Sequence, residues 1–421
     1  MAQSKKLFWS SAFLFTLLAS QPALAQSPSQ NPTVERQPVT PALATPKPQL
    51  DRWKPRDRHL IYVTLPGTLV ENSYRNGLGI VVLDANDGYR FIKRIPTWAP
   101  AASISPEQVA GVAASPVTNM IYLAMRGRLG AFDLKTEKMV WENEYDGFCC
   151  ERPQVTADGS ALVVGSDLKD FWYVVNPRTG DLITKIHAPQ SNNAHNLNIS
   201  PDGKLAFMAP NGPVISIGDI QSGKVVQTIR FGDNVRPFVL NKDASLIYAN
   251  TNKLLGYEVA DVKTGKVIKR VEAAGDWREK VKAMEARGKY PGHHCESHGI
   301  ALVNDEKEVW IVDNVNEKLL IFDNTLENPK VVAEIETAGN AYWITVGLDG
   351  DHVYLSSGDV IDTKTRKVVA QLKDEYGNVM HSEKLLGMMF SSGELQRVTN
   401  QFGNGYGDFN ALGQVTSVAA R

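Results

Sequence analysis

Short apolar segments with an aromatic residue near their centre recur along the chain from Arg58 onward. Five of them are IYVT at Ile61, IYLA at Ile121, IYAN at Ile247, VWIV at Val309 and VYLS at Val353. Such β-branched and aromatic residues favour a pleated, buried strand. The flanking positions alternate between apolar and polar with a period of two, and not with the longer period of a helix. The pattern predicts an all-β fold.

A second element repeats seven times: an apolar strand, an Asp or Asn, a polar turn and an alternating strand, which together read as a hairpin. The Asp or Asn positions are Asp84, Asp133, Asn176, Asp219, Asp261, Asp323 and Asp362. Their spacings are 49, 43, 43, 42, 62 and 39 residues. A period near 40 with four short strands per unit predicts a seven-bladed β-propeller of four-stranded antiparallel blades.

Closure of the ring requires strands from the two ends of this domain to pair. The first blade begins with HLIYVTL, and no inner strand precedes it. The C-terminal stretch HSEKLLGMMFSS, from His381, is the candidate for that inner strand, because pairing would remove an exposed sheet edge. The following stretch, GELQRVTNQFGNGYGDF, is expected to add an outer strand or to remain a loop.

The N-terminal segment has the features of an export signal. Lys5 and Lys6 precede an apolar run from Leu7 to Ala19, and Ala23-Leu24-Ala25 provides small residues before Gln26. The run is too short to span a bilayer comfortably, so we expect cleavage near Ala25, no transmembrane segment in the mature chain, and a periplasmic or secreted protein. We therefore divide the chain into a signal peptide (1–25), a flexible Pro/Gln/Ser-rich leader (26–57), the propeller (58–400) and a C-terminal tail (401–421).

The repeats resemble those of YVTN-type seven-bladed β-propellers, named for the tetrapeptide that IYVT and IYAN approximate. The resemblance covers about residues 58 to 400. It implies the propeller fold shared by quinoprotein amine dehydrogenase large subunits, the haem d1 domain of nitrite reductase, lactonases and proteins that only bind. Because one fold carries all these functions, the resemblance does not select among them.

The balance of charges bears on the class of partner. The chain has 45 basic and 46 acidic residues, and the formal net charge is -1. This balance gives no electrostatic reason to expect nucleic acid as a partner. A small molecule or a protein at the tunnel face is expected instead, and the sequence does not indicate an oligomeric state.

The predicted inner strands bring chemically active residues to one rim of the central tunnel. Turns joining the two inner strands contain Asp158, Asp202, Asp243, Asp305 and Asp349, and counting seven residues back from each gives equivalent rim positions. A one-residue uncertainty in the third blade adds Arg152 to this set. With their neighbours, the candidate ligand-binding residues are Glu151, Arg152, His195, Asn196, Arg236, His298, Tyr342 and Trp343. Mixed cationic and aromatic side chains suit an anionic or polar organic ligand.

Three histidines on this rim also support a metal hypothesis. His195, His298 and His381 belong to blades spaced three, two and two apart, so their imidazoles are candidates to converge on a divalent metal ion. Glu151 or Glu296 is a candidate fourth ligand or orienting partner. The alternative is that they bond to carbonyl groups and water, and no dense ligand motif decides between the two. The sequence does not select the metal.

The three cysteines lie in the crossings that lead into two blades. Cys149 and Cys150 belong to DGFCCERP, and Cys295 belongs to GHHCESHGIAL. An exported protein permits a vicinal Cys149-Cys150 disulfide, a bridge to Cys295, a redox-active pair, or soft metal ligands. The odd count leaves at least one thiol unpaired or intermolecular.

The long spacing of 62 residues contains an insertion of about 274–294. Asp276 is a plausible cap, Gly288 a stop, and Trp277, Val281 and Met284 share one face of a short helix. The insertion is expected to be a lid carrying His293 and His294, a docking element, or a helix packed on the blade edge.

Three functions are consistent with these residues. One is an exported protein that binds a ligand or partner at the tunnel mouth. Another is a metal-dependent enzyme of the lactonase, lyase or oxidoreductase type that uses His195, His298 and His381. The third is the large subunit of a multi-subunit quinoprotein dehydrogenase.

Overall fold

In the computed structural model, β-strands make up most of the described chain. The structure describes residues 57–66, 76–98, 109–125, 127–146, 150–166, 169–188, 193–291, 295–337 and 341–401. The predicted signal peptide, the leader up to residue 56, Cys149, His293, His294 and the tail from residue 402 lie outside the described residues.

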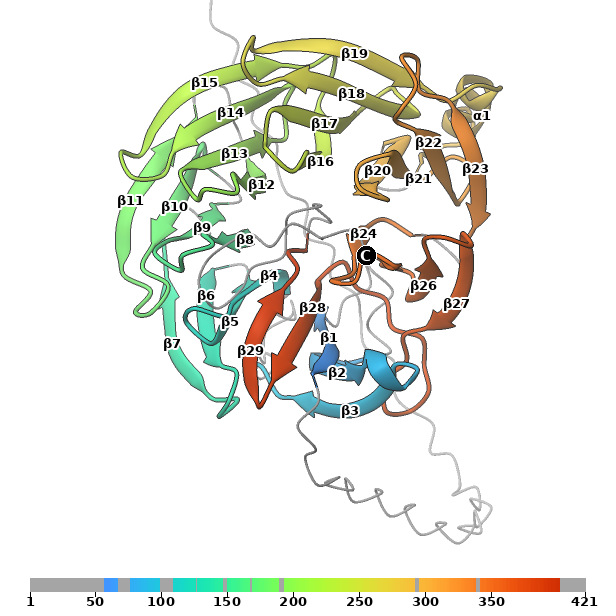
Figure 1. The fold of residues 1–421 in the computed structure, drawn as a ribbon. Coiled ribbons are helices and arrows are strands. Elements are labelled where there is room, and N and C mark those ends of the chain that lie inside the picture. Colours follow the sequence, from blue (N-terminus) through green and yellow to red (C-terminus); the bar gives the residue numbers. More distant parts are fainter. Residues whose placement is uncertain are drawn as a thin grey trace, which may run out of the picture. The chain divides into compact units, whose positions relative to one another are not determined.

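Seven antiparallel sheets surround a common centre, as Figure 1 shows. Six sheets have four strands and one has five in the described part of the chain. The predicted fold class, an all-β seven-bladed propeller, is confirmed. We number the blades by their second strands in chain order, so that blade 1 contains β1 and blade 7 contains β25.

The strands of the blades occupy four equivalent positions from the centre outward. The inner strands are β28 (Leu385–Ser391), β4 (Val109–Ser115), β8 (Glu151–Val155), β12 (Ala194–Ile199), β16 (Val235–Leu240), β20 (Ser297–Val303) and β24 (Ile344–Val346). The second strands are β1 (Arg58–Pro66), β5 (Met120–Met125), β9 (Leu162–Gly165), β13 (Leu205–Pro210), β17 (Leu246–Thr251), β21 (Glu308–Asp313) and β25 (His352–Leu355). The third strands are β2 (Leu78–Asp84), β6 (Arg128–Asp133), β10 (Phe171–Val175), β14 (Val214–Asp219), β18 (Gly256–Asp261), β22 (Lys318–Asp323) and β26 (Asp359–Asp362). The outer strands are β3 (Arg90–Ile95), β7 (Met139–Glu144), β11 (Leu182–His187), β15 (Lys224–Arg230), β19 (Lys266–Glu272), β23 (Val331–Glu336) and β27 (Lys367–Gln371).

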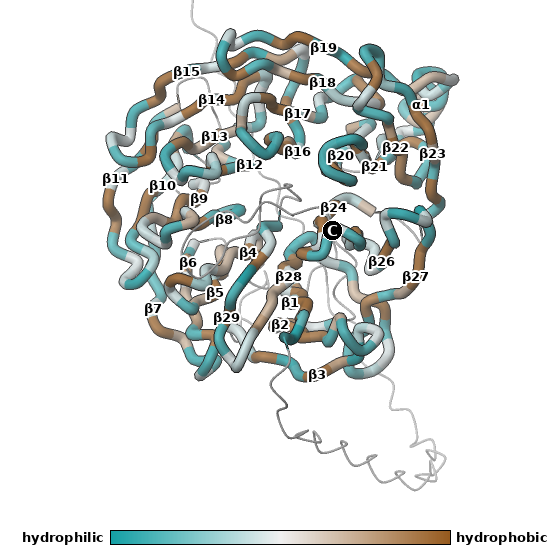
Figure 2. The backbone as a smooth tube through the Cα atoms, viewed as in Figure 1, coloured by the Kyte–Doolittle hydropathy of each residue, from teal (hydrophilic) through white to brown (hydrophobic). Residues whose placement is uncertain are grey.

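The core lies between neighbouring blades. The second and third strands are almost continuously buried, because both faces of each blade pack against another blade. Outer strands such as β15 and β23 alternate between exposed and partly buried residues, which Figure 2 shows as alternating colours. This explains why the sequence pattern alternates most clearly in the second half of each hairpin.

The ring is closed by the predicted C-terminal strand. Strand β28 pairs antiparallel with β1, from Arg58 opposite Phe390 to Val63 opposite Leu385. The backbone N–H of Thr64 continues the ladder by donating to the carbonyl of Lys384 at 2.8 Å. Closure between the N- and C-terminal strands is therefore confirmed.

The segment after the closing strand differs from both expectations. Residues Glu394–Val398 form strand β29, which pairs with β28 on the edge opposite β1 and so lies at the inner side of blade 1. Ser392 and Gly393 have φ angles of 52° and 87°, which allow the tight reversal between the two strands. The outer edge of β28 is already occupied by β1, so the returning strand pairs on the inner edge.

The insertion between blades 5 and 6 contains helix α1 (Trp277–Glu285). Trp277 and Val281 are buried against the apolar residues of those two blades. Met284 is only partly buried. Searching the described segments finds no helix with the length and apolar character needed to cross a lipid bilayer. The described residues also contain a short 3-10 turn, η2 (Ala85–Asp87).

Candidate functional site

Irregular pairing at the start of five inner strands creates the framework of the candidate site. In β4, β8, β12, β16 and β20 the register with the second strand shifts within the first few residues. A bulge of this kind leaves an extra residue outside the ladder and re-aims its side chain. Four predicted site residues lie at these irregularities: Arg152, His195, Arg236 and His298.

The backbone of Arg152 adopts a left-handed conformation with φ of 46°. This region is unfavourable for a residue with a side chain, and such strain is found where the surroundings fix the conformation. The neighbouring inner strand contributes to it: a Cβ atom on Gly111 of β4 would lie 2.6 Å from the backbone of Arg152 and 2.4 Å from Pro153. Only glycine permits this close approach of β4 to β8.

Glu151 and His195 form a pair between blades 3 and 4. Nδ1 of His195 is hydrogen-bonded to Oε2 of Glu151, and the two side chains are 25% and 15% exposed. Burial alone would raise the pKa of Glu151. The charge and hydrogen bond of His195, together with the charges of Arg152 and Lys384, outweigh burial and lower this pKa to about 2. Glu151 is therefore an anion at neutral pH and fixes the orientation of the imidazole.

The side chain of Arg152 extends across the centre of the ring. Its guanidinium lies 4.3 Å from the ring centroid of Trp343 in blade 7 and donates from Nη2 to Oε2 of Glu383 at 3.1 Å. Oε1 of Glu151 lies 3.7 Å from Nε of Arg152. Nζ of Lys384 lies 3.5 Å from the same Glu383 oxygen. Arg152 therefore links blades 3 and 7 to the crossing that leads into β28.

His298 is buried next to this group. Its Nδ1 donates to the backbone carbonyl of Tyr342 at 2.7 Å, and its ring lies 5.9 Å from that of Trp343. The residue is only 4% exposed. His298 therefore lies buried against the neighbouring inner strand, at the bulge in β20, and does not border water.

Arg236 and Asn196 complete the predicted residues in blades 4 and 5. Nε of Arg236 donates to Oδ1 of Asn252 at 2.5 Å. The charges of Arg236 and Glu383 both act on the pKa of the Cys295 thiol, Arg236 lowering it and Glu383 raising it. Asn196 is buried, and its Oδ1 accepts no hydrogen bond within the described residues. We use the term central cluster for Glu151, Arg152, His195, Arg236, His298, Trp343, Glu383 and Lys384.

His381 does not join the other two histidines of the metal hypothesis. Its backbone N–H donates to Oδ1 of Asn76 at 3.4 Å. The charge of Asp359, on the third strand of blade 7, acts on the pKa of its imidazole. Burial lowers the pKa of His381, while Asp359 acts in the opposite direction. Across the described ranges, no group of three or more His, Cys, Asp or Glu side chains is placed to hold a metal ion. Glu296 instead accepts from the backbone of Lys253.

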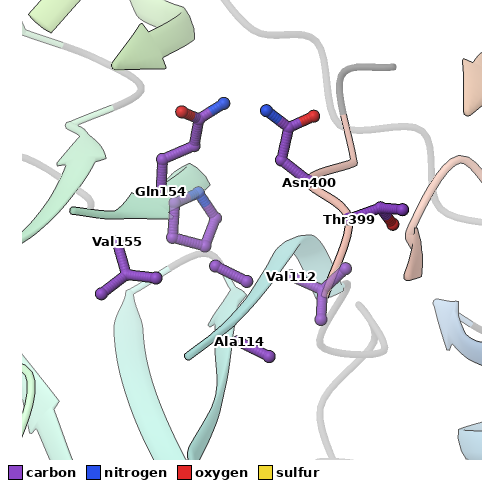
Figure 3. Close-up of a pocket in the computed structure, with 8 residues that line it drawn as sticks. Val112, Ala114, Gln154, Val155, Thr399 and Asn400 are labelled. Carbon is purple, nitrogen blue, oxygen red and sulfur yellow. The ribbon is translucent and has the colours of Figure 1, made fainter. Parts of the chain in front are cut away.

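Gln401, which follows β29, is hydrogen-bonded to the inner strands of two blades. The backbone carbonyl of Gln401 accepts from Nε1 of Trp343 and from Oγ1 of Thr345, and its side-chain oxygen accepts from the N–H of Val112 at 2.6 Å. These contacts join blades 2 and 7, the two neighbours of blade 1. A small pocket remains beside them, shown in Figure 3. It is lined by Val112, Ala113, Ala114, Pro153, Gln154, Val155, Thr399 and Asn400.

The cysteines do not form a bridge between the two crossings. Cys150 is disulfide-bonded, whereas Cys295 is a buried thiol outside any disulfide. Burial raises the pKa of Cys295 to about 12, with Arg236 acting in the opposite direction. The third cysteine, Cys149, lies outside the described residues. A thiolate at Cys295 is therefore strongly disfavoured in the folded protein.

We predict a thiol count that depends on folding. At pH 8 the native protein should react very slowly with a thiol reagent, because Cys295 is buried and protonated. In denaturant without reductant, one thiol per chain should react, and three should react after reduction, since Cys149 is the remaining partner for Cys150. Two or three reactive thiols before reduction would contradict this pairing.

Three contributors to the site were not identified from the sequence: Glu383, Lys384 and Gln401. None occupies a position that recurs in the repeats, so counting from the turn aspartates does not reach them. Glu383 and Lys384 lie two and three residues after His381, which was selected as the start of the closing strand. Two adjacent charged residues before an apolar strand were the available signal.

Comparison with known proteins gives information about the fold. No protein-family model matches the chain, and no curated protein matches it. Among solved structures it is similar to a chain of Kuenenia stuttgartiensis hydrazine synthase, with a TM-score of 0.53, 16% identity, and coverage of 68% of this chain and 89% of that chain. It is also similar to a chain in the crystal structure of the mitotic checkpoint complex, with a TM-score of 0.55, 12% identity and coverage of 70% and 80%. These similarities show the β-propeller fold alone.

Proposed function

We propose that this protein is an exported β-propeller of the YVTN type that binds a small polar or anionic ligand at the central cluster. The observation that carries the proposal is the convergence of cationic and aromatic side chains from different blades. Arg152 from blade 3 contacts Trp343 of blade 7, and His298 from blade 6 contacts the same indole. Side chains of this kind recognise anionic and polar groups through charge-assisted hydrogen bonds and stacking.

The bulges support a binding role for this region. Arg152 remains in an unfavourable backbone conformation with its charged group almost completely buried. Burying charges is costly even when they are paired, and well-packed apolar residues would often give equal stability. Buried, charged and strained groups of this kind cluster at functional sites. No observation among the described residues favours a metal-dependent reaction over binding.

We expect a ligand from a panel of small carboxylates, phosphates, amino acids and sugars to stabilise the protein against thermal unfolding. The binding should depend on Arg236 and His298. Arg236→Ala should weaken binding by about 10- to 100-fold, because a hydrogen bond to a charged group contributes about 1.5–3 kcal/mol. His298→Asn keeps a donor for the Tyr342 carbonyl and should weaken binding without a large loss of stability. Thermal shift assays followed by titration calorimetry measure both effects.

The matched control is Arg230→Ala, which removes an exposed arginine at the end of the outer strand β15. Its affinity should equal that of the wild type. If no panel member binds, or if Arg236→Ala and His298→Asn bind every ligand as the wild type does, the central cluster is not the binding site.

Export is proposed from the N-terminal sequence alone, which lies outside the described residues. Expression of the full chain with its native N-terminus should give a mature protein that starts at Gln26. N-terminal sequencing of material from the periplasm or medium tests this. An intact N-terminus that still contains Lys5 would contradict cleavage.

A further inference from the structure

The ligand-binding chemistry of the central cluster depends most on Arg152, because this side chain is both buried and incompletely hydrogen-bonded. The side chain is 5% exposed. Nη2 donates to Glu383, whereas Nε and Nη1 are buried and donate to no acceptor among the described residues. The contact from Nε to Glu151 is 3.7 Å, which is longer than a hydrogen bond. Buried polar groups without partners are rare, and each one requires an explanation.

A second group without a partner lies at the same indole. Gln401 is 1% exposed, and its Nε2 is also buried without an acceptor. Its backbone carbonyl accepts from Trp343, whose ring face stacks on Arg152. Arg152 and Gln401, which both contact Trp343, therefore have N–H groups without an acceptor among the described residues. A ligand that supplies acceptor oxygens would complement them, and a cationic ligand would not.

We propose that the ligand of the central cluster carries a carboxylate group that binds the guanidinium of Arg152 and displaces the carboxylate of Glu383. This inference rests on the proposed function and names the class of its ligand. The planar guanidinium presents several N–H groups in a fixed fork that matches two carboxylate oxygens. Stacking on Trp343 covers one face of the guanidinium, and a carboxylate binds in its plane.

Glu383 is suited to act as the internal carboxylate that the ligand replaces. Its Oε2 is shared between Arg152 at 3.1 Å and Lys384 at 3.5 Å. When it leaves Arg152, Lys384 can remain as its cationic partner, so no carboxylate is left buried without a cation. Glu383 also belongs to the crossing into β28 and not to a regular strand. That crossing is anchored at Ser382, whose Oγ donates to the carbonyl of Thr64 at 2.6 Å.

The small pocket is lined by sequence neighbours of both residues with spare donors. Pro153 and Gln154 follow Arg152 directly, and Asn400 precedes Gln401, and all three line the pocket. Figure 3 shows the amide groups of Gln154 and Asn400 pointing the same way at one end of it. The Gln154 amide is already hydrogen-bonded to Leu197, Asn198 and Ile199, so the donors open to a carboxylate are those of Arg152 and Gln401.

The test compares acetate and succinate with acetamide, which has the shape of acetate without its charge, and with inorganic phosphate. Titration calorimetry is performed on the full mature chain and three variants.

We expect the wild type to bind the carboxylates and not acetamide. Glu383→Gln should bind them about tenfold more tightly, because the competing carboxylate is removed. Arg152→Lys should bind them at least tenfold more weakly, because the fork is lost. Glu334→Gln, on the outer strand β23, is the control and should match the wild type.

A second measurement observes ligand binding in the wild-type protein and needs a variant only to assign one signal. In ¹⁵N-labelled protein, the arginine Nε–H signal that is absent from Arg152→Lys should shift during titration with acetate and stay unchanged with acetamide. If Arg152→Lys does not fold, Arg152→Gln identifies the signal.

The outcomes separate this inference from the proposed function. Tighter carboxylate binding by Glu383→Gln with a shifted Arg152 signal supports the inference. Carboxylate binding that is equal in wild type, Glu383→Gln and Arg152→Lys overturns it, as does preferential binding of phosphate. If only neutral ligands bind, and their binding depends on Arg236, the carboxylate inference fails while the proposed function stands. If no ligand binds, both fail.

Discussion

A chain that ends at Val379 is expected to aggregate, whereas a chain that ends at Ser391 is expected to remain a folded monomer. The shorter chain lacks β28, which supplies the inner pairing partner of β1. It also loses the buried side chains of Leu385, Leu386, Met388 and Phe390. At about 1.5–3 kcal/mol for each buried side chain, this loss is comparable to the total stability of an ordinary domain. The exposed edge of β1 would then be available to pair with other chains.

The chain that ends at Ser391 is the control, because it removes β29 and the residues at the ring centre but keeps closure by β28. Size-exclusion chromatography and thermal unfolding distinguish the two. We expect the longer chain to elute as a monomer with a lower melting temperature than the full chain. A monomeric chain ending at Val379 that melts like the full chain would show that β28 is not required to close the ring.

Replacing Glu151 with Gln is expected to lower the free energy of unfolding by up to about 3 kcal/mol at pH 7. The estimate follows from a pKa lowered from 4.5 to about 2 in the folded protein, at about 1.4 kcal/mol per unit. The substitution removes the charge that pairs with His195 while it preserves the shape of the side chain. Urea unfolding monitored by tryptophan fluorescence measures the difference.

The effect of this substitution should depend on pH in one direction. Because the folded-state pKa lies below the unfolded value, the contribution of Glu151 is complete above about pH 4.5 and is lost as the pH falls toward 2. The stability of the wild type should therefore approach that of Glu151→Gln in acid. Glu144→Gln, at an exposed position of the outer strand β7, serves as the control and should change little. A constant difference between wild type and Glu151→Gln from pH 7 to pH 3 would contradict the assigned interaction.

The propeller was predictable from the sequence because the same hairpin pattern recurs in every blade. Each hairpin places an Asp or Asn between an apolar and an alternating strand, and the repeat period sets the size of a blade. The missing inner strand of blade 1 also followed from the pattern, since an unpaired edge next to HLIYVTL requires a partner. Counting along the repeats then placed His195, Arg236 and His298 near the starts of inner strands, where the structure has them.

The central cluster was less predictable because its contacts do not repeat. The pattern gives the strand on which Arg152 lies, but not that its side chain crosses the ring to Trp343 and Glu383. His381 was chosen by position, whereas the crossing turns it toward Asn76 and brings Glu383 and Lys384 inward. The position of β29 depends on which edge of β28 is already occupied, and hydrophobic alternation does not encode that. Burial of His298 results from a bulge in β20, which a count of residues does not detect.

The most direct test of ligand binding at the ring centre is the indole N–H spectrum of the protein during titration with a ligand that stabilises it. The chain has eight tryptophans, and Trp343→Phe identifies the signal of the residue that contacts both Arg152 and His298. We expect the Trp343 signal to shift most, while those of Trp98 and Trp141, near the outer edges of blades 1 and 2, stay unchanged. An unchanged Trp343 signal with shifts at Trp98 or Trp141 would place the ligand on the outer surface and contradict binding at the central cluster.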